Sequence, residues 1–252
     1  PKIVFISLLC LIFSAAGSAM INNLIEREND ELMERLENRV KALKLVGVGN
    51  LSAVAAFLIT TSIALSAIYI NFLNCALIIL AIFSYTIYYT LFLKKSSPFG
   101  TVLGGIPGAL PVVIGYSSIQ PELSFGYVDI IVLFLFMMVW QPPHFWALAQ
   151  HLKDDYKKGG FPTMPIVYGQ EFTNYLIMIY SLALLPISLY FWIVGICSNF
   201  YGVMATLLGG SFLYLVFRSF REKKYYKSVF LFSILYMLLV NVFISIDIIF
   251  MK

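Results

Sequence analysis

Three polar side chains recur at intervals of four residues in the segment INNLIERENDELMERLENR, residues 21–39. On a helix this spacing places Asn22, Glu26 and Asp30 on one face, about one turn apart. Amide and carboxylate oxygens stacked in this way suit Mg²⁺, a hard cation that usually shares its protein ligands with a phosphate group. Arg35 and Arg39 repeat the spacing with the opposite charge, which is typical of a clamp for phosphate oxygens. A solvent-exposed helix with ordinary Glu–Arg pairs is the alternative interpretation.

A second polar group occurs in WQPPHFWALAQHLKDDYKKGGFPTMP, residues 140–165, where an apolar segment passes into a charged one. His144, His151 and Asp155 form one stripe if the helix continues past its two prolines. An ionisable residue within an apolar span is a functional candidate, so we expect His144 to contact a ligand. A structural histidine bonded to a backbone carbonyl is the alternative. For the neighbouring lysines and tryptophans, the alternative is anchoring at a membrane surface.

The elements that must position these residues are apolar. Of the 252 residues, 60% are hydrophobic and 12% are charged, whereas soluble domains carry about 25% charged residues. The mean hydropathy is +0.87. We therefore predict an all-α, polytopic transmembrane bundle, in which a net charge of +4 does not indicate a nucleic-acid partner. A bilayer requires helices of about 20 residues, and eight spans are expected at about residues 3–21, 46–69, 75–93, 101–119, 127–149, 174–197, 201–217 and 228–250.

The charges of the connections predict how the spans are oriented. The first, third, fifth and seventh connections carry lysines and arginines, whereas those at 70–74, 120–126 and 198–200 carry none. By the positive-inside rule the odd-numbered connections are cytoplasmic. Both ends of the chain then lie outside. Because the chain begins with Pro-Lys rather than Met, we expect a further helix upstream of residue 1.

The two polar groups thus share the cytoplasmic side, together with Lys94 and Lys95. Carboxylates for a metal, cations for a diphosphate and an aromatic-lined bundle outline a site for a prenyl diphosphate, where a metal and cations stabilise the departing group. Aromatic rings can stabilise an allylic cation. The candidates for that role, which also suit ordinary packing positions, are Tyr88, Tyr89, Tyr116 and Tyr156.

These residues are similar to a known family. Asn22-xxx-Glu26-xxx-Asp30, followed by Met33-x-Arg35 and Arg39, resembles the first Asp-rich motif of the intramembrane aromatic prenyltransferases. Three further runs resemble a narrower set within that family, the protoheme IX farnesyltransferases. They are KKSSPFGTVLGGIPGALPVVIG (94–115), WQPPHFWALA (140–149) and KDDYKKGGFPTMPIVYG (153–169).

The resemblance implies one intramembrane domain over residues 1–252, from a nine-helix bundle whose first helix is absent from this sequence. It implies transfer of farnesyl from farnesyl diphosphate to a vinyl group of haem B, giving haem O with the help of Mg²⁺. The site would face the cytoplasm in a bacterial cytoplasmic membrane. Haem A synthase or a terminal-oxidase assembly would be the partners.

The resemblance also assigns roles to individual residues. The first metal–diphosphate role falls to Asn22, Glu26 and Asp30, and the second to Asp154 and Asp155. The metal ligands would be Glu26, Asp30 and Asp155. The diphosphate would be bound by Arg35, Arg39, Lys94 and Lys153. His144 would contact the haem, as an iron ligand.

Three positions depart from the family pattern. Glu26 stands where the family has Asp, and its longer side chain moves a bound metal by about one methylene. Leu36 and Val40 replace the family's Thr and Pro. Two alternatives to the haem reaction remain at this point: prenyl transfer to a quinone precursor or chlorophyllide, and a haem-binding or transport protein without activity.

The charge pattern predicts which connections face the cytoplasm. In sealed cells, a cysteine introduced by Lys157→Cys should resist a membrane-impermeant thiol reagent, whereas one introduced by Asn199→Cys should react. The measurement is mass-tag labelling before and after lysis. Labelling at position 157 from the outside would overturn the orientation.

Overall fold

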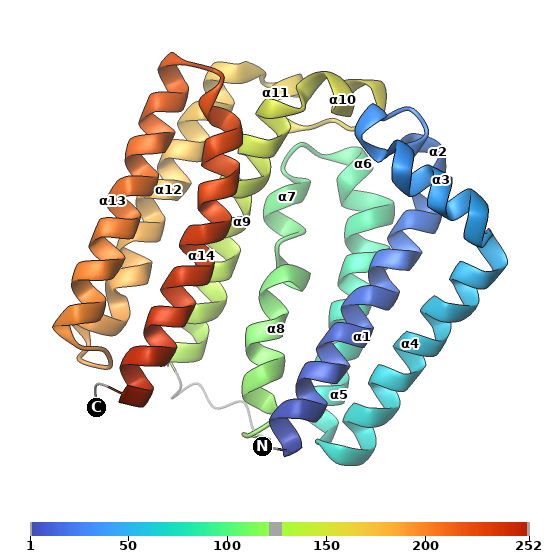
Figure 1. The fold of residues 1–252 in the computed structure, drawn as a ribbon, viewed down its shortest axis with the longest axis horizontal. Coiled ribbons are helices and arrows are strands. Elements are labelled where there is room, and N and C mark those ends of the chain that lie inside the picture. Colours follow the sequence, from blue (N-terminus) through green and yellow to red (C-terminus); the bar gives the residue numbers. More distant parts are fainter. Residues whose placement is uncertain (1, 121–127, 251–252) are drawn as a thin grey trace. The chain divides into compact units, whose positions relative to one another are not determined.

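The computed structural model describes residues 2–120 and 128–250, and the regular elements in those ranges are all helices (Figure 1). Eight helical segments are long and apolar enough to cross a membrane. They are Lys2–Ile25, Val48–Tyr69, Phe72–Ser96, Gly100–Ser117, Val128–His151, Gly169–Ile193, Asn199–Arg221 and Tyr225–Phe250. The predicted all-α class and the eight predicted spans are confirmed. Most of the connection predicted at 120–126 lies outside the described residues.

The helices divide into two compact units. The first contains residues 1–130 and 154–162, and the second contains residues 131–153 and 163–252. The predicted metal and diphosphate residues therefore fall in the first unit, apart from Lys153. The second unit holds Lys153 and His144. Each unit is described by itself below.

In the first unit, α1 (Lys2–Ile25) packs along α4 (Val48–Tyr69). Small residues make this close approach possible, as is common between membrane helices. A Cβ added to Gly17 of α1 would lie 2.7 Å from the Ile59 side chain. The Ser62 hydroxyl of α4 donates to the Cys10 carbonyl at 2.7 Å. Behind this pair, α5 (Phe72–Phe83) packs on α8 (Ile106–Ser117).

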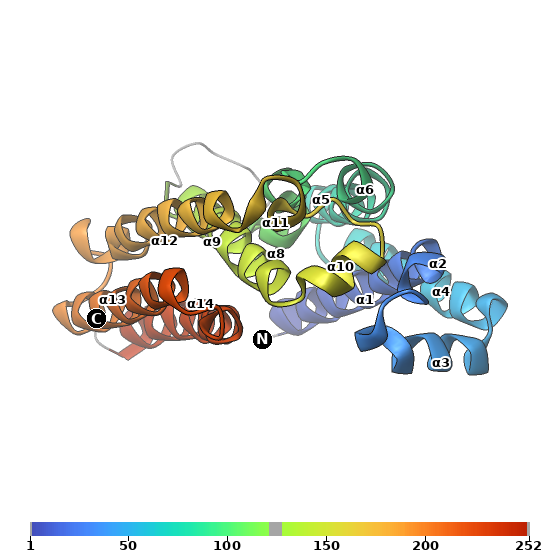
Figure 2. The same cartoon turned by 90° about the horizontal axis from the view of Figure 1, so that it is seen from above.

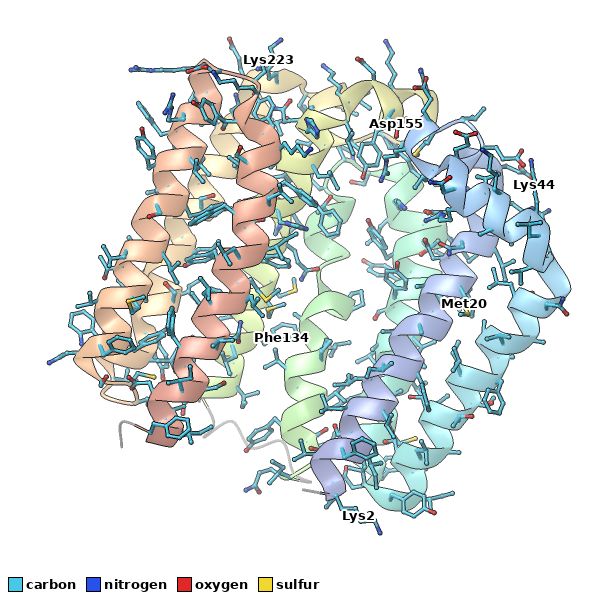
Figure 3. All side chains as sticks on the ribbon, in the orientation of Figure 1. Lys2, Met20, Lys44, Phe134, Asp155 and Lys223 are labelled. Carbon is cyan, nitrogen blue, oxygen red and sulfur yellow. The ribbon has the colours of Figure 1, made fainter. Side chains whose placement is uncertain are left out.

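Short polar elements gather at one end of the first unit (Figures 1 and 2). Between α1 and α4 lie α2 (Arg27–Asp30), η1 (Glu34–Leu36) and α3 (Glu37–Val46). Gly47 joins α3 to α4 with a φ of 83°, a conformation that favours glycine. The other elements of this end are α6 (Lys94–Ser96), α7 (Gly100–Leu103) and α10 (Lys153–Lys158). Figure 3 shows Asp155 and Lys44 at this end and Lys2 at the opposite end.

Between α5 and α6 the chain forms a π-helix, η2 (Ser84–Leu93). A π-helix bonds each N–H to the carbonyl five residues back, so its turns are wider than those of an α-helix. Such segments are rare and are often found at functional sites. This one leads directly into Lys94.

The second unit contains most of α9 (Val128–His151), then α11 (Met164–Val167), α12 (Gly169–Ile193), α13 (Asn199–Arg221) and α14 (Tyr225–Phe250). Aromatic side chains fill its core. Phe212 stacks on Tyr236 with ring centroids 5.5 Å apart, and both are almost fully buried. At the far end of α14, the Asp247 carboxylate accepts the backbone N–H of Ser198 at 2.6 Å, next to the start of α13.

The stripe predicted along residues 144–155 is wrong beyond His151. The helix does continue past Pro142 and Pro143, as the prediction required, but α9 ends at His151 and a separate helix begins at Lys153. His144 is buried, whereas His151 is exposed. The two histidines therefore do not share one buried face.

Candidate active site

The three polar residues of the first motif lie on one buried face of the first unit. The Glu26 N–H donates to the Asn22 carbonyl at 3.0 Å, and the Asp30 N–H donates to the Glu26 carbonyl at 2.9 Å. These bonds carry the helical spacing across the bend between α1 and α2. Asn22, Glu26 and Asp30 are 5%, 1% and 3% exposed. The exposed Glu–Arg helix expected as the alternative does not describe these three residues.

Three carboxylates of this unit, two of them buried and one half-buried, are each paired with one cation. Glu26 Oε2 lies 2.7 Å from Lys94 Nζ, and Asp30 pairs with Arg39. Asp155 Oδ2 lies 2.9 Å from Arg35 Nε. These six residues, Glu26, Asp30, Arg35, Arg39, Lys94 and Asp155, are called the charge cluster below. A buried charge is tolerated only when it is paired, so the pairs explain how the carboxylates can be buried.

Two segments far apart in the sequence meet in this cluster (Figure 2). The Glu34 N–H donates to Asp155 Oδ1 at 3.1 Å. The Asn29 amide donates to the Gly159 carbonyl at 2.9 Å. Met33, which is 2% exposed, packs against Gly159. The acidic helix after the first span and the segment 154–161 are thus in direct contact.

Aromatic rings lie directly beside two of the cations. Arg35 Cζ is 4.9 Å from the centroid of the Tyr156 ring, and Lys94 Nζ is 4.9 Å from that of Phe161. Burial raises the pKa of the Tyr156 phenol, although the Arg35 guanidinium opposes that shift. Tyr156 is therefore a neutral ring at neutral pH. Burial lowers the pKa of the Arg39 guanidinium, and the Glu26 carboxylate opposes that shift.

The UbiA prenyltransferase family matches residues 1–242. The chain belongs to the UbiA prenyltransferase family. It is 42% identical to a protoheme IX farnesyltransferase of Geotalea uraniireducens, over 89% of this chain and 88% of that protein. It is 39% identical to a protoheme IX farnesyltransferase of Aquifex aeolicus, over 94% of this chain and 80% of that protein.

Solved structures of the family share the fold. The structure described as digeranylgeranylglyceryl phosphate synthase matches with a TM-score of 0.77 and 17% identity, over 97% of this chain and 85% of that one. A UbiA homolog from Archaeoglobus fulgidus, bound to GPP and Mg²⁺, matches with a TM-score of 0.65 and 17% identity. The match covers 97% of this chain and 88% of the homolog's chain. The family resemblance inferred from the motifs is confirmed.

The oxygen atoms of this UbiA-family site fit a divalent cation that brings further ligands with it. Glu26 Oε1 is buried and has no hydrogen-bond partner among the described residues. In the same part of the chain, no three acidic, histidine or cysteine side chains are grouped closely enough to hold a metal by themselves. Mg²⁺ is commonly held by one or two carboxylates together with substrate phosphates and water. The residues present are therefore compatible with a metal that arrives with a diphosphate.

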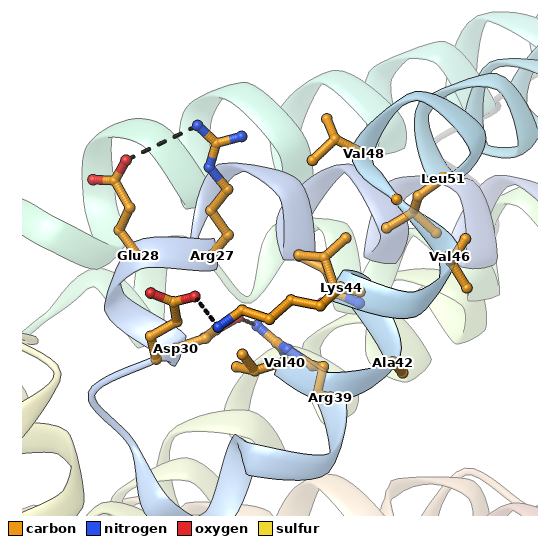
Figure 4. Close-up of a pocket in the computed structure, with 14 residues that line it drawn as sticks. Arg27, Glu28, Asp30, Arg39, Val40, Ala42, Lys44, Val46, Val48 and Leu51 are labelled. Carbon is orange, nitrogen blue, oxygen red and sulfur yellow. Dashed lines mark hydrogen bonds and ion pairs between the residues drawn. The ribbon is translucent and has the colours of Figure 1, made fainter.

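A cavity of about 400 Å³ borders the site between α2, α3 and α4 (Figure 4). It touches the charge cluster only at Asp30 and Arg39. Its other charged residues include Lys44, which lies 2.9 Å from Glu31, and Arg27, which lies 4.0 Å from Glu28. Much of the remaining wall is apolar. We take the charge cluster, and not this cavity, as the candidate site.

Some predicted residues do not join the cluster. Asp154 is exposed, whereas its neighbour Asp155 faces Arg35. Tyr88 is 39% exposed. Lys153 makes no ion pair with any described residue. Conversely, Asn29, Thr90 and Phe161 contact the site and were missed. The signal for Thr90 was its position four residues before Lys94, which copies the spacing from Asn22 to Glu26.

In the second unit, His144 is held between two aromatic rings. The centroids of Trp140 and Phe230 each lie 4.6 Å from that of the imidazole. His144 Nδ1 lies 2.7 Å from the Ser233 hydroxyl, which donates its own proton to the Phe230 carbonyl at 2.6 Å. Ser233 can then only accept from His144. The tautomer that fits this hydroxyl geometry carries its proton on Nδ1 and its lone pair on Nε2.

The contacts between residues 29–34 and 154–161 should contribute measurably to stability. Asn29→Ala removes one hydrogen bond between them and should lower the free energy of unfolding by about 1 kcal/mol. Asn38→Ala is the control, because Asn38 is exposed on α3. Thermal unfolding of the detergent-solubilised variants measures the difference. Equal melting temperatures for the two variants would contradict the contact.

Proposed function

We propose that this chain transfers a farnesyl group from farnesyl diphosphate to a vinyl group of haem B, giving haem O. The observation that carries the donor half is the charge cluster, in which three carboxylates and three cations are matched one to one. The names of the relatives support haem B as the acceptor. They do not favour the alternatives of a quinone or chlorophyllide acceptor or of a haem-binding protein without activity.

The paired charges are suited to an exchange of partners. Lys94, Arg39 and Arg35 can turn from their carboxylates to the diphosphate oxygens. Glu26 and Asp30, with the Asn22 amide, would hold Mg²⁺, and Asp155 and its neighbour Asp154 would provide the second set of oxygens. When bound, Mg²⁺ stabilises the negative charge of the leaving diphosphate. Cations and carboxylates are equal in number. After the exchange, the cations are neutralised by the diphosphate and the carboxylates by the metal, so no charge is left without a counter-charge.

The reaction breaks the C1–O bond of farnesyl diphosphate, the π bond of the vinyl group and one O–H bond of water, and it forms one C–C and one C–O bond. The C1–O bond of farnesyl diphosphate breaks, and its electron pair leaves with the diphosphate. A vinyl carbon of haem forms the new C–C bond to C1. Water adds to the resulting cation and loses a proton, which completes the hydroxyethylfarnesyl group. The rings of Tyr156 and Phe161 are placed beside the cations that bind the diphosphate, so their faces can stabilise the allylic cation.

The haem is proposed to bind His144 in the second unit. A neutral imidazole with a lone pair on Nε2 is a good ligand for haem iron. The hydrogen bond from Nδ1 to Ser233 fixes the ring, as the outer partners of metal-binding histidines commonly do. The rings of Trp140 and Phe230 offer apolar surface beside it.

The cellular setting belongs to the same proposal. The charge of the connections supports a cytoplasmic membrane with the charge cluster on the cytoplasmic side. Lys153 is expected to bind the diphosphate from there. The consumers of haem O would be haem A synthase or the assembly of a terminal oxidase.

The proposed reaction predicts that a specific product forms and that it forms much more slowly when a metal ligand is removed. The purified chain with haem B, farnesyl diphosphate and Mg²⁺ should form a more apolar haem, heavier by farnesyl and water, detected by liquid chromatography and mass spectrometry. Asp30→Ala should reduce the rate at least about 100-fold, because a lost metal ligand removes several kcal/mol of stabilisation. Glu26→Asp keeps the carboxylate and should keep or raise the rate. Unchanged turnover in Asp30→Ala would refute the metal role.

A change at His144 should affect the binding of haem but not the binding of farnesyl diphosphate. We expect His144→Ala to weaken haem binding at least about tenfold while retention of radiolabelled farnesyl diphosphate stays unchanged. Arg39→Ala should have the opposite effect. His151→Ala, which changes the exposed histidine of the same helix, is the control. If His144→Ala titrates with haem as the wild type does, His144 is a structural histidine and a quinone-type acceptor regains support.

A further inference from the structure

One hydrogen bond at the charge cluster has no role in the site described so far. The Asn22 amide nitrogen, Nδ2, donates to the Thr90 hydroxyl at 3.1 Å. Both side chains are buried, with 5% of Asn22 and 0% of Thr90 exposed. Asn22 lies on α1 and Thr90 on the π-helix η2, so the bond joins two elements of the first unit.

The Thr90 hydroxyl can act only as an acceptor toward Asn22. A threonine hydroxyl has one proton to donate and lone pairs that accept. Thr90 Oγ1 donates that proton to the Tyr85 carbonyl at 2.8 Å. The amide of Asn22 must therefore turn its NH₂ group toward Thr90 and its oxygen away. That oxygen accepts no hydrogen bond from the described residues.

The orientation of this amide matters for a metal. A carboxylate presents an oxygen whichever way it is turned, whereas an amide presents an oxygen on one side and an NH₂ group on the other. An Asn22 amide turned the wrong way would direct two N–H donors at a cation. We propose that Thr90 is a positioning residue, which holds the Asn22 amide with its oxygen available to the metal and diphosphate. This inference rests on the proposed function and specifies one part of it.

The π-helix residue Thr90 and Lys94, which directly follows the π-helix, have the same four-residue spacing as Asn22 and Glu26. Asn22 bonds Thr90 and Glu26 bonds Lys94, and each pair is separated by 68 residues. Asn22 and Glu26 are therefore four residues apart on one side of the contact, and Thr90 and Lys94 are four residues apart on the other. Thr90 reaches the carbonyl five residues back, as the wide turn of a π-helix permits. By contrast Thr86, on the same helix, bonds the Ile82 carbonyl four residues back.

The test measures binding without turnover. Retention of radiolabelled farnesyl diphosphate by the full chain is recorded, without haem, as a function of Mg²⁺ concentration. Thr90→Val keeps the shape of the side chain and removes the hydroxyl. We expect it to raise the Mg²⁺ concentration for half-maximal retention about tenfold, the lower end of the range for lost outer partners of metal ligands. Thr90→Ser should restore the wild-type value.

The matched control is Thr86→Val, which removes the same atoms from another buried threonine of η2. It should leave the Mg²⁺ dependence unchanged. In an Asn22→Asp background, Thr90→Val should have less than a twofold further effect, because a carboxylate needs no orientation. A Thr90→Val curve that matches Thr86→Val, or a full tenfold shift in the Asn22→Asp background, would overturn the positioning role alone. Wild-type retention that ignores Mg²⁺ would overturn the metal part of the proposed function and this inference with it.

Discussion

The pairing of Glu26 with Lys94 is the interaction on which the rest of the site depends. Glu26 is 1% exposed, and an isolated carboxylate at such a position would be strongly destabilised. Removing one partner of a buried pair costs roughly 3–5 kcal/mol, because the remaining charge has no counter-charge. The bend between α1 and α2 and the end of η2 must therefore stay in contact. That contact brings Asn22 and Thr90 together one turn away.

Buried ion pairs add little stability compared with well-packed apolar residues, so their presence here points to function. A pair can be opened by a ligand that carries both signs of charge, since each partner then finds a new one. A ligand with only one sign would leave half of the cluster unsatisfied. On the proposed function, the charge cluster suits a metal together with an anion because each partner of a pair then finds a new one.

Much of this could be predicted from the sequence, because the predictions rest on simple periodicities. Apolar length sets the spans, and four-residue spacing puts Asn22, Glu26 and Asp30 on one face. Four-residue spacing does not choose between Asp154 and Asp155, since neighbouring helical residues point in different directions. The family resemblance named Asp155 as the metal ligand, and the structure pairs Asp155 with Arg35. The π-helix could not be predicted either, because the composition of residues 84–93 does not distinguish it from an α-helix. The stripe from His144 to Asp155 failed for a local reason, the end of α9 at His151.

Thr90 and Ser233 share a feature that separates them from the ion pairs. Each hydroxyl gives its proton to a carbonyl of its own helix, and each then accepts from a functional side chain, Asn22 in one case and His144 in the other. Neither hydroxyl changes its protonation in the physiological pH range. Salt also does not weaken these neutral hydrogen bonds as it weakens ion pairs. Each hydroxyl is thus oriented by a backbone carbonyl of its own helix, and it orients the amide or the imidazole in turn. Changes in ionic strength can alter the ion pairs of the charge cluster, while the orientation of these two side chains stays the same.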